Sequence, residues 1–294
     1  LDGRLPDPSQ ACRTVAEMSN RFTRWLGRLG PTLVLLAAAV FFIAPLVSSF
    51  RVAFHKVPTV LLDRHTWFQK WSFEGVRRAF DEPNFWPTLS LSLRLALITV
   101  LITMALLVPT ALFVHLRLPK ARALVEFFTL LPYVVPPIAL VAGIAAFYRA
   151  NARWFLNTDY ALAPFYVVMA MPFTYRAIDA GIKAIDVRTL VDASRSLGGS
   201  WAMTLRKAIL PNMATSLLSS AFLTATVVIG EFTIASTLAK NTFATFSFEY
   251  FGRDAQGGIG LALLTLIGTT GLLGILTLLT RTKSRRAMST TSRF

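Results

Sequence analysis

The chain has 294 residues, of which 54% are hydrophobic and only 15% are charged. Soluble domains carry about 25% charged residues, so this composition excludes an ordinary soluble domain and indicates a membrane protein. The formal net charge of +15 would suit a nucleic-acid-binding protein, but basic residues in short loops between apolar spans orient a membrane protein instead.

The N-terminal stretch is polar, and we predict a tail over residues 1–28. The first apolar run follows Arg21, Arg24 and Arg28 and has no small-residue cleavage site. This pattern is typical of a retained signal anchor and not of a removed signal peptide.

Six charge-free runs follow one another along the chain. A bilayer core needs about 20 apolar residues as helix. The runs are 29–50, 95–114, 127–148, 160–175, 208–230 and 255–280. The fourth has only 16 residues but is apolar and flanked by loops, and the fifth continues past Glu231 to about Leu238. We therefore predict an all-α polytopic protein with six transmembrane helices within residues 29–283, followed by a tail over 284–294.

Six spans place both termini on one side of the membrane. With the termini inside, the inner segments hold 19 Lys and Arg residues and the outer segments hold 10, six of them in one long loop. Because basic residues gather on the cytoplasmic side, we expect both termini to be cytoplasmic. Most of the positive charge is then explained without nucleic acid.

Proline residues predict discontinuity within the spans. The third span contains Pro132 and the pair Pro136-Pro137, and further prolines interrupt other spans at Pro45, Pro109, Pro164 and Pro172. Proline removes a helix hydrogen bond and kinks the helix, and kinked helices around a cavity suit a gated pathway. Single prolines are also common in membrane helices without such a role.

The polar stretch from Asp192 to Pro211 lies between the fourth and fifth spans. The pair Gly198-Gly199 separates two short amphipathic helices, and Ser200 is a good N-cap for the second. Such a segment can dock as a helix in the groove of a soluble partner or lie on the lipid surface, and the residues alone leave both open.

Glu231 follows 23 uncharged residues and precedes another apolar octet. Intramembrane charge is costly and usually faces a bundle interior or a wet cavity, so Glu231 is a candidate pathway residue; the alternative is a capping glutamate near the outer interface. Tyr133, Phe173 and Tyr175 can offer cation–π faces, although aromatic residues in spans more often pack or anchor.

Several kinds of catalytic site are absent from the sequence. No lysine follows a glycine, which excludes a P-loop, and neither H-E-x-x-H nor Gly-x-Ser-x-Gly occurs. The single cysteine, Cys12, excludes a disulfide framework and a cysteine zinc site. We expect no catalytic residue, no metal site and no cofactor, and a membrane-embedded enzyme is the weakest alternative.

The stretch from Asp192 to Pro211 resembles the cytoplasmic signature of permease subunits of binding-protein-dependent ABC importers, E-A-A-x3-G-x9-I-x-L-P. Asp192, Ala193 and Ser194 stand at E-A-A, Gly198 at the glycine, and Leu210-Pro211 at the end; Asp192, Ser194 and Ala208 depart from the pattern. The resemblance covers roughly residues 29–283 and includes FEGVRRAFDEPNFWPTLSLSLRLA and LLPYVVPPIALVAGI.

This resemblance implies the type I ABC importer permease fold, with a cytoplasmic coupling loop over 178–211. It implies two copies of a separate ABC ATPase subunit, a second permease that is identical or related, and an extracytoplasmic binding protein in a prokaryotic cell membrane. Asp192 is expected to pair with a basic residue of the ATPase, and Gly198 to make the turn. The remaining residues expected to contact the ATPase are Ala193, Ser194, Leu197, Gly199, Trp201, Leu205, Leu210 and Pro211.

The cargo is suggested only by finer similarity. The segment SRSLGGS resembles the ARSLGAS form of polyamine, phosphonate, ferric-iron, sulfate and molybdate permeases, and the overall pattern is most similar to spermidine/putrescine permeases. We therefore expect a polyamine, with phosphonate, ferric iron or another small solute as alternatives. A channel or secondary transporter without ATP is a second alternative, but long internal repeats and coupling-ion carboxylates are lacking.

Overall fold

The computed structural model describes residues 8–55 and 71–291, with side chains over 30–55, 71–275 and at 278. The ends of the two expected tails, residues 1–7 and 292–294, lie outside these ranges. So do Lys56, Arg64 and Lys70, three basic residues of the expected long outer loop.

The described residues are almost entirely helical. Their only β-type pairing is an isolated antiparallel bridge between His55 and Trp71. The longer helices are α1 (Pro8–Ala53), α2 (Glu74–Asp81), α3 (Phe85–Arg117), α4 (Arg122–Val134), α5 (Pro137–Asn151), α7 (Leu162–Lys183), α8 (Val187–Ser196), α11 (Ala214–Ile229), α13 (Phe243–Arg253) and α14 (Ala255–Thr291). Short elements join them: η3 (Pro119–Ala121), α6 (Arg153–Leu156), η4 (Asp159–Ala161), α9 (Trp201–Thr204), the π-helix η5 (Leu205–Ile209), α10 (Leu210–Asn212) and α12 (Thr233–Thr237).

The apolar helices confirm the predicted polytopic, all-α class. Five of them are long and apolar enough to cross a membrane, and the bent pair α4–α5 makes up to six within the described part of the chain. The fifth span begins at Ala214 and not at residue 208, because 208–213 complete the preceding turns. It continues past Glu231 as expected, but as the separate short helix α12.

The expected break in the third span falls at the proline pair. The two halves α4 and α5 meet at an angle of 94° across Val135 and Pro136. Pro137 is the first residue of α5, where its missing N–H costs nothing. By contrast, Pro109 and Pro172 lie inside helices that remain single elements, and Pro164 lies in the first turn of α7.

The core of the bundle is formed by α3, α7 and α11, with α4 packed on α7. The α7 span is the most buried of the five single-helix spans, and it extends to Lys183, well past the charge-free run. Between α7 and α11 the hydroxyls of Thr174 and Thr224 lie 2.6 Å apart in a buried contact. One apolar cluster lies around Leu162, and a second one lies beside α8 and includes Ile178 and Ile209.

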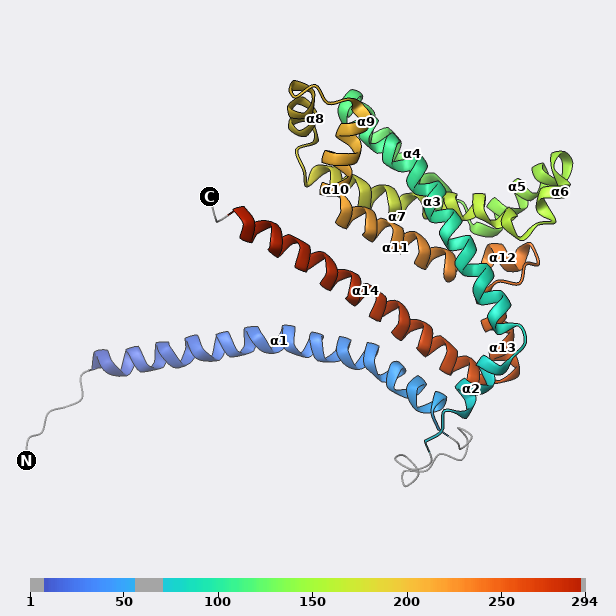
Figure 1. Ribbon diagram of the computed structural model, residues 1–294. Coiled ribbons are helices and arrows are strands. Elements are labelled where there is room, and N and C mark those ends of the chain that lie inside the picture. The colour runs from blue at the N-terminus through green and yellow to red at the C-terminus, as the bar shows by residue number, and fades with distance from the viewer. Residues whose placement is uncertain (1–7, 56–70, 292–294) are drawn as a thin grey trace, which may run out of the picture.

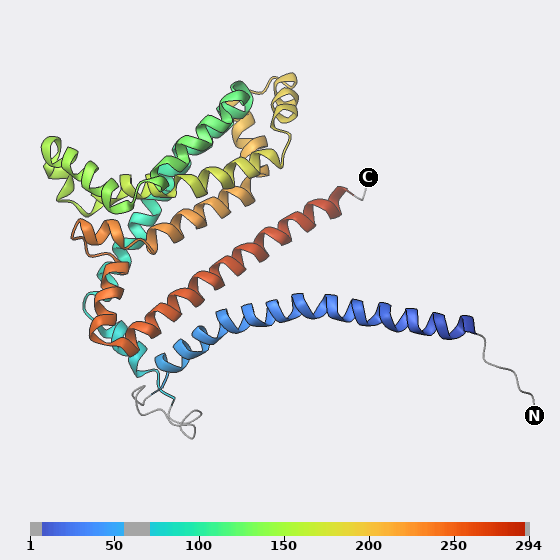
Figure 2. The same cartoon turned by 180° about the vertical axis from the view of Figure 1, so that it is seen from behind.

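Figures 1 and 2 show that the two ends of the bundle carry different structures. One end holds α2 and α13; the other, where α3 ends, holds α8, α9 and α10. We call these the α13 end and the α8 end. Near the α13 end α1 packs against α14 through Ala53 and Leu263, and both helices then diverge from α7 and α11.

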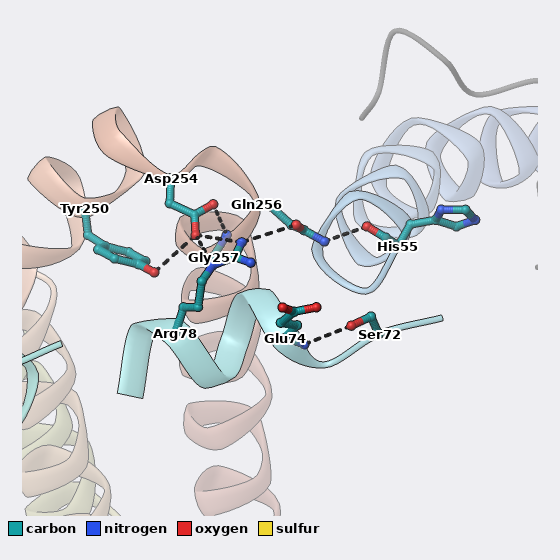
Figure 3. A network of polar contacts seen from close by, with 8 residues as sticks. All are labelled: His55, Ser72, Glu74, Arg78, Tyr250, Asp254, Gln256 and Gly257. Carbon is teal, nitrogen blue, oxygen red and sulfur yellow. Dashed lines mark hydrogen bonds and ion pairs between the residues drawn. The ribbon is translucent and has the colours of Figure 1, made fainter. Parts of the chain in front are cut away.

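A polar network fastens the α13 end (Figure 3). The Arg78 guanidinium of α2 lies 2.9 Å from the Asp254 carboxylate, which also accepts the Gly257 N–H at 3.0 Å. Gln256 donates to the carbonyl of His55 at the end of α1. The network therefore joins α1, α2, α13 and α14 at one point.

Candidate functional site

The α8 helix begins at a side-chain cap. The Asp186 carboxylate accepts the Thr189 hydroxyl at 2.6 Å and the Thr189 N–H at 3.2 Å. These hydrogen bonds, the one from the hydroxyl first, lower the pKa of Asp186 below its ordinary value of 3.8. Val187 and Val191 bury one face of α8 against the apolar cluster of the bundle. The cap and this face fix where α8 starts and how it is rotated.

A Schellman motif ends α8 at the predicted glycine turn. Gly198 has φ +76°, the Gly199 N–H donates to Ser194 O at 2.8 Å, and the Gly198 N–H donates to Arg195 O at 2.9 Å. A Cβ at Gly199 would lie 2.5 Å from Ser194 Oγ and 2.7 Å from Ser194 O. Both glycines are thus required by the backbone, Gly198 for its conformation and Gly199 for its close approach to Ser194.

Ser200 is the N-cap of the returning helix α9, as predicted. The Ser200 hydroxyl accepts the Met203 N–H at 3.4 Å. Between the two helices the hydroxyls of Ser194 and Thr204 lie 2.7 Å apart. This contact ties α9 back to α8, so the two helices form one unit.

The helix then continues as the π-helix η5, which was not predicted from the sequence. The Leu210 N–H donates to Leu205 O, five residues back. Pro211 has no N–H to offer the carbonyl of Lys207, and its ring crowds that carbonyl, which favours a local change of helix pitch. Buried Ile209 and Met213 then join the cluster that holds Val187.

The residues expected to couple to an ATPase divide by exposure. Asp192, Ala193, Leu197 and Pro211 are exposed, while Ser194, Leu205 and Leu210 are half-buried. Leu197 is 88% exposed, more than any other large hydrophobic residue whose side chain is described. An apolar side chain displayed at the tip of a capped two-helix unit suits a docking contact.

Trp201 and Leu205 line a cavity of about 730 Å³ between α3 and α8. Asp192 lies on its wall as well. These three residues therefore face the space beside α3, while Leu197 does not line it.

A buried ionic cluster next to α8 was missed by the sequence analysis. The Asp179 carboxylate of α7 accepts two hydrogen bonds from the Arg122 guanidinium of α4, at 2.9 and 2.8 Å. His115 Nε2 of α3 and Lys183 Nζ of α7 each lie 2.7 Å from it. The Asp179 side chain is 9% exposed, so one carboxylate joins the ends of three helices.

Glu231 occupies the break between α11 and α12. Its two carboxylate oxygens each accept the Ile234 N–H at 3.0 Å, and Oε2 also accepts the Ala235 N–H at 3.4 Å. This is the capping arrangement that the sequence left as the alternative to a pathway role.

The three candidate aromatic residues do not form one group. Tyr133 and Phe173 form an edge-to-face pair with ring centroids 5.3 Å apart, close to the break between α4 and α5. Tyr175 is fully buried in the cluster beside α8.

A second cavity, of about 450 Å³, lies at the α13 end. It is lined by charged groups of both signs, Arg94, Asp159, Glu249 and Arg253. Lys240 Nζ lies 3.7 Å from Asp159, on the edge of this cavity.

Comparisons with known proteins agree with this architecture. Residues 97–285 match the family described as "Binding-protein-dependent transport system inner membrane component". A search of curated proteins found no match. Among solved structures, the chain is similar to one in a "bacterial ABC transporter involved in the import of the acidic polysaccharide alginate". The TM-score is 0.64 at 14% sequence identity, over 88% of this chain and 97% of that chain. At this identity the likeness shows the fold.

Proposed function

Because the chain belongs to the family of binding-protein-dependent transport system inner membrane components, and is therefore a permease subunit of an ABC importer, we propose that its α8–α10 segment couples it to a separate ATPase. The α8–α10 segment comprises Val187–Asn212. No lysine of the chain follows a glycine, so the sequence lacks a P-loop and a partner has to supply ATP hydrolysis.

The exposure of Leu197 is the observation that carries this proposal. At 88% exposed it contributes little to the packing of the permease itself. A groove on the ATPase would bury it, and burying a leucine stabilises a complex by about 1.5–3 kcal/mol. Ala193 and Asp192 are exposed on α8, the helix that Leu197 ends, and we propose that Asp192 pairs with a basic residue at the rim of that groove.

The side of the α8–α10 segment that packs on α3 and α7 explains how a displacement of the segment would be transmitted to the spans. Val187 and Val191 of α8 and Ile209 of η5 pack in one cluster with Ile178 of α7 and Leu112 of α3. Displacement of α8 by a closing ATPase pair would therefore move α3 and α7. Gly198 and Gly199 keep the two helices at a fixed angle while this happens.

The remaining subunits follow from the family. We propose two ATPase copies at the α8 end, a second permease of identical or related sequence, and a binding protein that delivers cargo at the α13 end. The α8 end and both termini then face the cytoplasm of a prokaryotic cell. In this reading residues 29–283 form the permease domain, 1–28 and 284–294 are tails, and the coupling loop of 178–211 includes the last turns of α7.

We further propose a polyamine as the cargo. The sequence pattern supports it, as does the exposed aromatic pair Tyr133–Phe173. The cavity at the α13 end adds no support by its charge, because Arg94 and Arg253 balance Asp159 and Glu249 there. Glu231 adds less, because its oxygens already accept backbone N–H groups. Phosphonate, ferric iron and other small solutes are the competing cargoes.

The decisive experiment is co-purification from mild detergent. The tagged chain is expected to bring down a P-loop subunit, identified by mass spectrometry, with ATPase activity in the complex. A chain that purifies alone and conducts or transports without ATP would establish the channel or secondary-transporter alternative. Proteoliposomes of the complex with its binding protein would then be tested for uptake of labelled spermidine in competition with putrescine, phosphonate and ferric iron.

A further inference from the structure

The cavity between α3 and α8 has an apolar wall to which the proposed mechanism assigns no ligand. Pro109, Leu112, Phe113 and Leu116 of α3 form one side of its volume of about 730 Å³. Phe113 is exposed, although it lies within a membrane-spanning helix. Trp201 faces these residues from α9.

Three arginines line the same cavity. Arg117 is the last residue of α3, and Arg188 and Arg195 lie two turns apart on α8. All three are exposed, and none forms an ion pair with another residue in the described part of the chain. Asp192 is the one carboxylate on the wall, so the cavity has a net positive charge.

The polar and apolar parts of the cavity are separated along α3. Pro109 and Arg117 are eight residues apart, which corresponds to about 12 Å of helix. The arginine lies where the span ends, and the apolar residues lie deeper in the membrane-spanning stretch. A free anion would use only the arginines, and a soluble protein surface does not reach residues at the depth of the hydrocarbon. A phospholipid matches both parts at once.

We propose that this cavity binds an anionic phospholipid, with its phosphate among Arg117, Arg188 and Arg195 and an acyl chain along Pro109, Leu112 and Phe113. Basic pockets beside membrane helices recognise anionic headgroups in this way. The proposal goes beyond the coupling function and does not depend on the cargo. It requires that Asp192, Trp201 and Leu205, which line the cavity and are expected to contact the ATPase, leave room for the lipid in the docked complex. A bound lipid would connect α8 to α3 at the point where coupling motion starts.

Trp201 provides a probe inside the cavity. The complex, as purified, is placed in nanodiscs of unbrominated zwitterionic lipid that contain a rising fraction of phosphatidylglycerol with brominated acyl chains. Brominated phosphatidylcholine serves as the headgroup control. Bromine quenches tryptophan on contact, and subtraction of the Trp201→Phe variant isolates the signal of Trp201.

Brominated phosphatidylglycerol is expected to quench Trp201 at a much lower fraction than brominated phosphatidylcholine. Arg117→Gln should raise the half-saturating fraction about fivefold, corresponding to about 1 kcal/mol for one basic residue, and removal of all three arginines about a hundredfold. The half-saturating fraction for Arg117→Lys should stay close to that of the unmodified chain. Arg206→Gln is the matched control, because Arg206 is exposed in the same segment and does not line the cavity.

Three results would overturn the proposal. Equal quenching by the two lipids would show that the headgroup is not recognised. Reversal of the quenching by inorganic phosphate would assign the arginines to a free anion. Loss of quenching when the ATPase subunit is added to the isolated permease would assign the cavity to a protein surface. Co-purification of the ATPase with Arg117→Gln, measured separately, distinguishes a failure of this proposal from a failure of coupling.

Discussion

The Asp179 carboxylate of α7 is held by both arms of the Arg122 guanidinium of α4, at 2.9 and 2.8 Å. The two residues are 57 positions apart, and Asp179 lies one turn before the end of α7 at Lys183. Bidentate pairs of this kind fix orientation as well as distance. The end of α7, from which α8 departs, is therefore locked to the start of the broken third span.

We expect Asp179→Asn to destabilise the permease by about 2 kcal/mol. Removing one partner of a buried ion pair costs about 3–5 kcal/mol, and the partial exposure of Arg122 and Lys183 reduces this value. Thermal unfolding in detergent, followed by size-exclusion chromatography, measures the effect. Lys183→Gln removes a half-exposed partner and should cost less than half as much; equal losses would contradict a central role for Asp179.

Leu197→Ser should weaken ATPase association at least tenfold without changing the stability of the permease. The side chain is 88% exposed in the free chain, so only a docked complex loses its burial. The measurement is the amount of ATPase retained in a pull-down, beside the melting temperature of the permease alone. Leu118→Ser is the matched control, because Leu118 is 50% exposed at the same end but lies outside the α8–α10 segment. Equal ATPase loss in both variants would contradict docking at Leu197.

Gly198→Asp should abolish cargo uptake while the protein inserts normally. The position has φ +76°, so any side chain there carries backbone strain, but a Cβ meets no atom within 4 Å. A carboxylate beside Leu197 would have to lose its hydration in the docked complex. Gly198→Asn is the matched control, since asparagine tolerates the same φ without charge and should retain more uptake. Normal uptake by Gly198→Asp at normal membrane levels would refute the docking of this turn.

The network at the α13 end predicts a pH-dependent contribution from Asp254. Burial by itself would raise the pKa of Asp254, but the Gly257 N–H and the Arg78 guanidinium outweigh it and hold the pKa below its ordinary value of 3.8. A lowered pKa in the folded state stabilises the fold above pH 3.8, and this stabilisation is lost as the pH falls through the lowered value. Asp254→Asn should therefore cost about 1 kcal/mol at neutral pH, and this cost should disappear as the pH falls below 3.8 and through the lowered pKa. A difference in unfolding temperature that is constant with pH would argue against this origin.

Local sequence rules predicted the parts of the site that depend on neighbouring residues. The turn at Gly198, the cap at Ser200 and the break at Pro136-Pro137 each follow from the backbone chemistry of one or two residues, and the structure has all three. The apolar runs located the spans for the same reason, since hydropathy is a local property.

Features that depend on long-range pairing could not be predicted in this way. Asp179 and Lys183 were assigned to the loop, because the charge-free run of the fourth span ends at Tyr175. In the structure α7 continues as a helix to Lys183, and His115 and Arg122, which are distant in the sequence, lie against Asp179. Glu231 is the reverse case. The charge suggested a pathway residue, but in the structure its carboxylate accepts the Ile234 N–H at the start of α12, a short helix that no periodicity indicated.

Substitutions of Glu231 therefore distinguish a structural role of this residue from a role in transport. If capping is its role, Glu231→Gln keeps an acceptor for the Ile234 N–H, and uptake should fall by no more than about threefold. Glu231→Ala loses the cap, which is worth about 1 kcal/mol, and should lower both stability and uptake. The measurement pairs the melting temperature with uptake of labelled spermidine over a range of concentrations. If the polyamine instead binds the negative charge directly, Glu231→Gln should raise the KM for uptake as much as Glu231→Ala does. The melting temperature of Glu231→Gln should then stay unchanged. That second pattern would place the carboxylate on the pathway, and the first would place it in the scaffold that holds α12 against α5.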